Sequence, residues 1–165
     1  PIMKHKRLAL LTQGALIAAL YTALTYLINY FGLANGAIQV RISEALTILP
    51  VFTPAAIPGL FIGCLLSNLL TGAAIWDIVF GSLASLLGAV FTYLLRKHEK
   101  LAALPPILSN TLIIPFVLKW AYGVPDALPY LFLTVGLGEL LFCGVLGMIL
   151  LYALKPRAKM LFPQN

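Results

Sequence analysis

Residues 128–154 read LPYLFLTVGLGELLFCGVLGMILLYAL, and this stretch decides the fold class because it contains a single charged side chain, Glu139. An apolar run of this length exceeds the roughly 20 helical residues that cross a hydrocarbon core of about 30 Å. In the whole chain of 165 residues, 61% are hydrophobic and 10% are charged. The surface of a soluble domain of this size cannot cover so much apolar area. The sequence therefore predicts an all-α polytopic membrane protein.

The positive charges lie at the ends of the apolar stretches. Nine of the eleven lysines and arginines fall in three clusters, at Lys4–Arg7, Arg96–Lys100 and Lys155–Lys159. Cationic loops remain on the cytoplasmic side of a membrane. We therefore expect the three clusters to share that side, with an even number of crossings between them and both termini cytoplasmic.

Six spans satisfy this parity. The apolar stretch from residue 45 to 72 divides into two short spans at Pro50, Pro54 and Pro58, because proline removes a backbone donor and disfavours helix in the preceding residue. If this stretch forms one span, the count becomes five and the three basic clusters cannot all lie on the cytoplasmic side. The chain is thus predicted to be a single membrane domain, residues 1–165, a six-helix bundle with spans at about 8–31, 44–53, 55–72, 76–95, 101–120 and 128–154.

Several function classes are disfavoured by the sequence. The net charge of +6 comes from basic residues at span ends, not from a patch interleaved with aromatic residues, so nucleic-acid binding is not expected. The two cysteines have no metal-ligand spacing, and no cofactor is indicated. There is no nucleophile–base arrangement for an enzyme and no Walker phosphate loop, so any ATP must be used by a partner.

Glu139 is the leading candidate for ligand binding. A charge within a bilayer costs several kcal/mol and is retained where it pairs or binds something. A structural role is the alternative, either as an ion pair with Lys119 or Arg41 or as a protonated carboxyl packed against neighbouring helices. Asn110 and Asn68 could join Glu139 in a site, although interhelical hydrogen bonds are a common role for such amides.

Two boundary segments carry further polar candidates. Asp77 follows Trp76 at an outer boundary, where tryptophan is also expected as a membrane-interface anchor. Arg41 and Glu44 lie three residues apart and can pair across one helical turn, either as a latch at the external entrance of a cavity or as a plain boundary salt bridge. Ser43 could equally cap this helix.

A ridge of small residues lies in the first span. Ala15, Ala19 and Ala23 repeat every four residues, with Gly14 and Ala18 on the neighbouring ridge. Small residues at this period let another helix approach closely. The ridge is therefore expected either to dock a partner protein or to pack within the six-helix bundle.

Three longer runs resemble a known family. Residues 39–50 (QVRISEALTILP), 58–69 (PGLFIGCLLSNL) and 76–84 (WDIVFGSLA) are similar to the QueT family, which comprises substrate-binding S components of energy-coupling factor (ECF) transporters. The resemblance implies a six-helix subunit of the prokaryotic plasma membrane that captures a vitamin-like substrate from outside. An ECF coupling protein and two cytoplasmic ATPases would complete the transporter. The alanine ridge is similar to the AxxxA element by which S components dock on the coupling protein.

The family is associated with queuosine precursors, which are 7-deazaguanines, and this implies roles for the polar residues. A carboxylate such as Glu139 can accept both donors of a guanine-like edge, and amides can serve the carbonyl and ring nitrogens. A cationic aminomethyl group would suit Asp77 or an aromatic face, whereas a nitrile would need neither. The implied substrate-binding set is Glu139, Asn110, Asn68, Trp76, Asp77, Arg41, Glu44 and Tyr130, with Tyr122 and Phe132 as further aromatic faces and with the loops at residues 35–41 and 72–77 closing over the base.

Two other transport functions remain open from the sequence. The chain could be an S component for another heterocyclic vitamin. It could also be an autonomous secondary transporter in which Glu139 carries protons, although no internal repeat suggests the inverted-repeat architecture of such transporters.

Overall fold

The computed structural model describes residues 2–33 and 40–164 of the chain, and within these ranges the protein is all-helical, with no strand. The main helices are α1 (Ile2–Tyr30), α2 (Ala56–Leu70), α3 (Ile75–Leu94), α4 (Leu104–Trp120), α5 (Leu128–Glu139) and α6 (Leu146–Leu154). A 3-10 helix, η2 (Ile42–Val51), precedes α2, and a π-helical segment, η4 (Leu140–Val145), joins α5 to α6. Short pieces complete the list: η3 (Glu99–Leu101), η5 (Lys155–Arg157) and α7 (Ala158–Leu161).

In the described part of the chain, four helical segments are long and apolar enough to cross a membrane: Ile2–Tyr30, Ile75–Leu94, Glu99–Trp120 and Leu128–Leu161. The protein is therefore a multi-pass membrane protein, and the many exposed leucines on these helices match a lipid environment. The 10-residue η2 rises about 2.0 Å per residue, as 3-10 helices do, and so spans about 20 Å. A membrane crossing by η2 and α2, and hence the count of six spans, remains a prediction.

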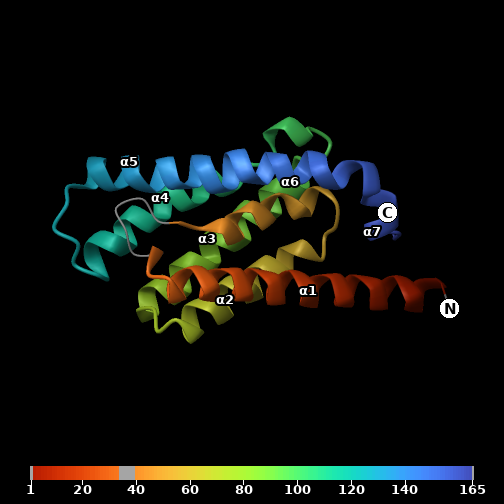
Figure 1. The fold of residues 1–165 in the computed structure, drawn as a ribbon, viewed down its shortest axis with the longest axis horizontal. Helices are drawn as coiled ribbons and strands as arrows, with labels where there is room; N and C mark the ends of the chain where they lie inside the picture. Colours follow the sequence, from red (N-terminus) through yellow and green to blue (C-terminus); the bar gives the residue numbers. More distant parts are fainter. Residues whose placement is uncertain (1, 34–39, 165) are drawn as a thin grey trace.

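Both termini lie at one end of the bundle (Figure 1). The start of α1, the end of α3 and the end of α6 all lie toward this end, and the three basic clusters lie in or beside these helix ends. Lys155 forms an ion pair with Glu99, which joins the second cluster to the third. The positive-inside rule then predicts that this is the cytoplasmic end and that the α4–α5 loop at the opposite end is external.

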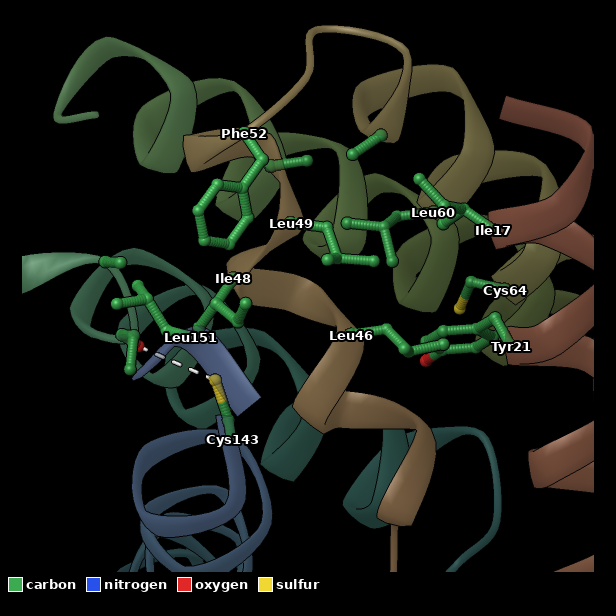
Figure 2. Packing of buried hydrophobic residues seen from close by; sticks show 14 of the residues in the cluster. Ile17, Tyr21, Leu46, Ile48, Leu49, Phe52, Leu60, Cys64, Cys143 and Leu151 are labelled. Atoms are coloured by element: carbon green, nitrogen blue, oxygen red, sulfur yellow. Dashed lines mark hydrogen bonds between the residues drawn. The ribbon is translucent and has the colours of Figure 1, made fainter. Parts of the chain in front are cut away.

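η2 occupies the middle of the bundle. All its residues from Ser43 to Pro50 except Ala45 are buried, and it contacts α1, α2, α3, η4 and α6. Figure 2 shows Leu46, Ile48 and Leu49 of η2 in the same apolar cluster as Tyr21 of α1 and Leu151 of α6. A helix that is buried on every side needs an almost continuous apolar sequence. The second half of η2, which ends in Ile48, Leu49 and Pro50, has such a sequence. Its few polar side chains must find partners within the protein.

Helices α1 and α2 pack with almost no space between their backbones. A Cβ atom added to Gly59 would lie 2.9 Å from the carbonyl oxygen of Gly14, and one added to Gly63 would lie 2.9 Å from Cβ of Tyr21. Only glycine at these two positions permits the approach. The close contact fixes Tyr21 relative to the rest of the bundle.

The orientation can be tested with single cysteines. Native Cys64 and Cys143 are buried and should not react with a membrane-impermeant maleimide. We expect Pro125→Cys, in the exposed α4–α5 loop, to be labelled in intact cells, and Lys97→Cys, in the second basic cluster, to be labelled only after permeabilisation. Labelling of Lys97→Cys in intact cells would contradict the assigned orientation.

Candidate functional site

A cavity of about 630 Å³ lies at the end of the bundle opposite the termini. Its wall comes from the ends of α1, α2 and α4, the beginnings of η2 and α3, one face of α5 along its whole length, and the α2–α3 and α4–α5 loops. The volume falls within the roughly 300–1,000 Å³ usual for small-molecule sites. All the elements that the sequence places at this end contribute, so the cavity depends on the fold of the whole bundle.

Glu139, the last residue of α5, lines the inner part of this cavity and is only 2% exposed. Its Oε2 accepts one long hydrogen bond, 3.5 Å, from Nδ2 of Asn110. Within the described ranges no cation pairs with it, so the predicted alternative of an ion pair with Lys119 or Arg41 is wrong. Lys119 donates to the main-chain oxygen of Asp126 instead. A buried carboxylate with so few partners has free acceptor capacity for a ligand.

A layer of buried polar residues lies behind Glu139. Asn110, which is 2% exposed, directs Nδ2 toward Oε2 of Glu44 at 3.4 Å and the main-chain oxygen of Pro106 at 3.1 Å. Tyr21 donates to Oε1 of Glu44 at 2.7 Å. One amide nitrogen thus bridges two carboxylates from η2 and α5. This network holds Glu139 in place without supplying a counter-charge to it.

The sequence-predicted pair of Arg41 and Glu44 is confirmed, with 3.9 Å between Nε and Oε1. Arg41 lines the cavity, whereas Glu44 lies in the layer behind and is 1% exposed. The alternative helix cap at Ser43 is wrong. Arg41 is the residue at the N-cap position, no side chain caps η2, and Ser43 accepts a 2.8 Å hydrogen bond from Thr25.

The outer wall contains Asn68, Asp77 and Tyr122. Tyr122 donates to Oδ2 of Asp77 at 2.6 Å and accepts from the backbone N–H of Ala74 at 3.0 Å. Asn68 donates to the main-chain oxygen of Asp77 at 3.4 Å, which leaves its side-chain oxygen available to a ligand. Partial burial raises the pKa of Tyr122 to about 12, and the hydrogen bond to Asp77 acts in the same direction. The phenol is therefore protonated at neutral pH and remains the donor.

The aromatic candidates separate into two groups. Tyr130 and Tyr122 line the cavity. Trp76 does not: it is 57% exposed and stacks on Phe80 at 6.0 Å on the outer surface, beside an apolar groove. Phe132 likewise contacts Phe116 and not the cavity. Trp76 therefore does not belong to the predicted site. A residue at the start of a helix can face either lipid or the interior, and its position in the sequence does not show which.

The alanine ridge of α1 faces outward. Ala15, Ala19 and Ala23 are exposed, while Ala18 is buried against Gly63 of α2. The neighbouring ridge therefore makes the internal contact, and the alternative that Ala15, Ala19 and Ala23 pack within the bundle is wrong. Their surface is free to meet another helix.

Tyr21 is the main site residue that the sequence reasoning missed. Its signal was present, because Tyr21 follows Gly14 and Ala18 at helical spacing and so belongs on the buried face of α1. The sequence reasoning also missed Thr25, Ser43, Thr71 and Thr134 as residues that line the cavity. Of the predicted closing loop at residues 72–77, Gly72, Ala73 and Asp77 line the cavity. Of the predicted loop at residues 35–41, Arg41 lines the cavity, as does residue 40, while residues 35–39 lie outside the described residues.

Comparison with known proteins agrees with the resemblance in sequence. The family model described as "QueT transporter" matches residues 11–156. The Queuosine precursor transporter QueT of Lactococcus lactis subsp. cremoris (strain MG1363) is 33% identical over 84 residues, which are 51% of this chain. The match spans about half of that relative, 49% of its length. No solved structure matches the chain.

Proposed function

Because this chain belongs to the QueT transporter family, we propose that it is the substrate-binding subunit of an energy-coupling factor importer that captures a queuosine precursor, a 7-deazaguanine, from outside. The observation that carries the proposal is Glu139, a buried carboxylate on the inner wall of a cavity of about 630 Å³ that pairs with no cation in the described part of the chain. A guanine-like edge presents a ring N–H and an amino group side by side, and one carboxylate can accept both. Binding and release, without chemical conversion of the base, are then the whole task of this subunit.

Other residues of the cavity supply what the remaining edges of such a base require. Arg41, which directly precedes η2, offers a donor, and the side-chain oxygen of Asn68 in α2 offers an acceptor. Tyr130 and Tyr122 provide flat apolar faces for the rings. An adenine-like base would place an acceptor against Glu139, and a buried group left unpaired costs roughly 1 to 3 kcal/mol. The site should therefore discriminate guanine-like bases from adenine-like ones.

The experiment that tests the proposed function is calorimetric binding to the purified chain. The ligands are the aminomethyl, nitrile and queuine forms of 7-deazaguanine, with guanine and adenine as controls. We expect at least one deazaguanine to bind in the nanomolar range, about −12 kcal/mol at 1 nM, and adenine not to bind. Failure of folded protein to bind any of the three deazaguanines would refute the cargo assignment.

Energy coupling is proposed to come from partner proteins. The sequence contains no Walker phosphate loop, and the exposed ridge of Ala15, Ala19 and Ala23 offers a smooth surface to a helix of an ECF coupling protein, which would itself work with two ATPases. A proton-coupled transporter that works alone through Glu139 is the second candidate.

Ala19→Leu separates these two mechanisms. The larger side chain should block helix docking, so we expect ATP-dependent uptake by the assembled transporter to fall at least tenfold while substrate binding to the isolated chain is unchanged. Ala153→Leu is the matched control, because Ala153 is also an exposed alanine but lies on α6. Full uptake by Ala19→Leu, or uptake in cells without coupling partners, would favour the autonomous transporter.

A further inference from the structure

The charged side chains around the cavity do not balance. Among the residues that the structure describes, Arg41 is the only cation that lines it, and Arg41 is paired with Glu44 behind the wall at 3.9 Å. Three carboxylates also line it, on Glu139, Asp77 and Asp126. None of them forms an ion pair with a described residue; nearby Lys119 donates to a main-chain oxygen, at 3.0 Å. Residues 34–39 read ANGAIQ and add no charge. Among the described residues, the wall of the cavity therefore has more acidic side chains than basic ones, and two of the acidic ones, Asp77 and Asp126, lie outside its buried inner part.

Two of these carboxylates differ in depth. Glu139 is almost completely buried, whereas Asp77, in the first turn of α3, is only partly buried and so lies nearer the cavity mouth. A base that reaches Glu139 with one edge can thus present a substituent from its other edge to Asp77.

Asp77 is also held in a fixed orientation. Tyr122 spans the gap between the α4–α5 loop and the α2–α3 loop, donating to Oδ2 of Asp77 at 2.6 Å while accepting from the N–H of Ala74 at 3.0 Å. Among the described residues no donor binds Oδ1, which leaves this oxygen for a ligand. A pre-oriented carboxylate loses little entropy when it accepts a charged donor.

We propose that the cavity selects a positively charged base and that Asp77 is the residue that receives its ammonium group. This inference rests on the proposed function and narrows the cargo to a 7-deazaguanine with an aminomethyl arm. A primary alkylamine, like that of lysine with a pKa of about 10.4, is protonated at neutral pH and donates to Asp77. The nitrile is neutral and is an acceptor only, so it would face the oxygens of Asp77 without a hydrogen bond.

The test compares two ligands on one set of variants by calorimetry. In the unmodified protein the aminomethyl base should bind at least tenfold more tightly than the nitrile base. Asp77→Asn should weaken the aminomethyl base at least tenfold and change the affinity for the nitrile base less than about twofold, since one unit of negative charge is lost without a change of shape. Tyr122→Phe, which frees Asp77 from its tether, should weaken the aminomethyl base by a smaller factor. Glu99→Gln, at the opposite end of the bundle, is the control for a general change of charge.

Three results would overturn the inference and leave the proposed function standing. They are equal or tighter binding of the nitrile base by the unmodified protein, equal weakening of both ligands by Asp77→Asn, and no effect of Asp77→Asn on either ligand. If Asp77→Asn does not fold, the ligand preference of the unmodified protein and the Tyr122→Phe variant decide the question. Absence of binding of both bases to the unmodified protein refutes the proposed function itself and is therefore a separate outcome.

Discussion

Replacing Glu139 by glutamine is expected to weaken the binding of a 7-deazaguanine about a hundredfold. In the proposed complex, the Glu139 carboxylate accepts two hydrogen bonds from the base, each worth roughly 1.5 to 3 kcal/mol. In Glu139→Gln, the amide oxygen keeps one of these hydrogen bonds, while the amide NH₂ group faces the second donor of the base and repels it. A loss of about 3 kcal/mol corresponds to about two powers of ten in the dissociation constant. Calorimetry on the purified variant measures this loss directly.

Glu99→Gln is the matched control for this result. It makes the same chemical change at a carboxylate that pairs with Lys155 at the other end of the bundle, and its binding should equal that of the unmodified protein. If Glu139→Gln binds as tightly as the control, Glu139 has a structural role and the base is read by other residues.

Gly63→Ala is expected to cause a large loss of stability for the addition of a single methyl group. The new Cβ would lie 2.9 Å from Cβ of Tyr21 and 3.1 Å from the main-chain oxygen of Ala18, and neither group can move without separating α1 from α2. Overpacking of this kind costs about 1 to 3 kcal/mol, or about 2 to 4 °C in the unfolding midpoint for each kcal/mol in a chain of this size. Thermal unfolding in detergent measures the midpoint.

The same substitution should weaken ligand binding, because a displaced Tyr21 loses its 2.7 Å hydrogen bond to Glu44. Gly136→Ala is the control: its Cβ would make an ordinary 3.4 Å contact with Thr111, and alanine is favoured over glycine inside a helix by up to about 1 kcal/mol. A midpoint for Gly63→Ala as high as that of Gly136→Ala would show that the two helices do not approach as closely as described.

The sequence predicted those features that depend on composition and local spacing. Glu139 was identifiable because a charged residue in an apolar run is costly, and the pair of Arg41 and Glu44 followed from their separation by three residues. The all-helical membrane fold followed from the length of the apolar runs. Each of these inferences needs only neighbours along the chain.

Features that depend on contacts between distant segments were not predictable in this way. The bridge that Asn110 makes between Glu44 and Glu139 joins three separate elements, and no local pattern encodes it. The outward position of Trp76 depends on how α3 is rotated, which packing against its neighbours determines. The 3-10 geometry of η2 is also a property of a segment enclosed on all sides, and its sequence did not distinguish it from an α-helix.

The wide turn η4 has a consequence for how this helix tolerates changes in length. Glu139, Cys143, Gly147 and Leu151 are all buried and follow one another at intervals of four residues. In a regular α-helix such an interval rotates each residue about 40° past the previous one, or about 120° in total by Leu151. In η4 the N–H of Leu146 bonds to the oxygen of Leu141, five residues back, and the turn therefore advances fewer degrees per residue. Deleting residue 144 or 145 would convert the wide turn to regular helix and leave Leu151 only about 20° from the direction of Glu139. Gly147 and Leu151 should then still face the bundle, so this stretch should tolerate the loss of a single residue better than the regular helix on either side of it.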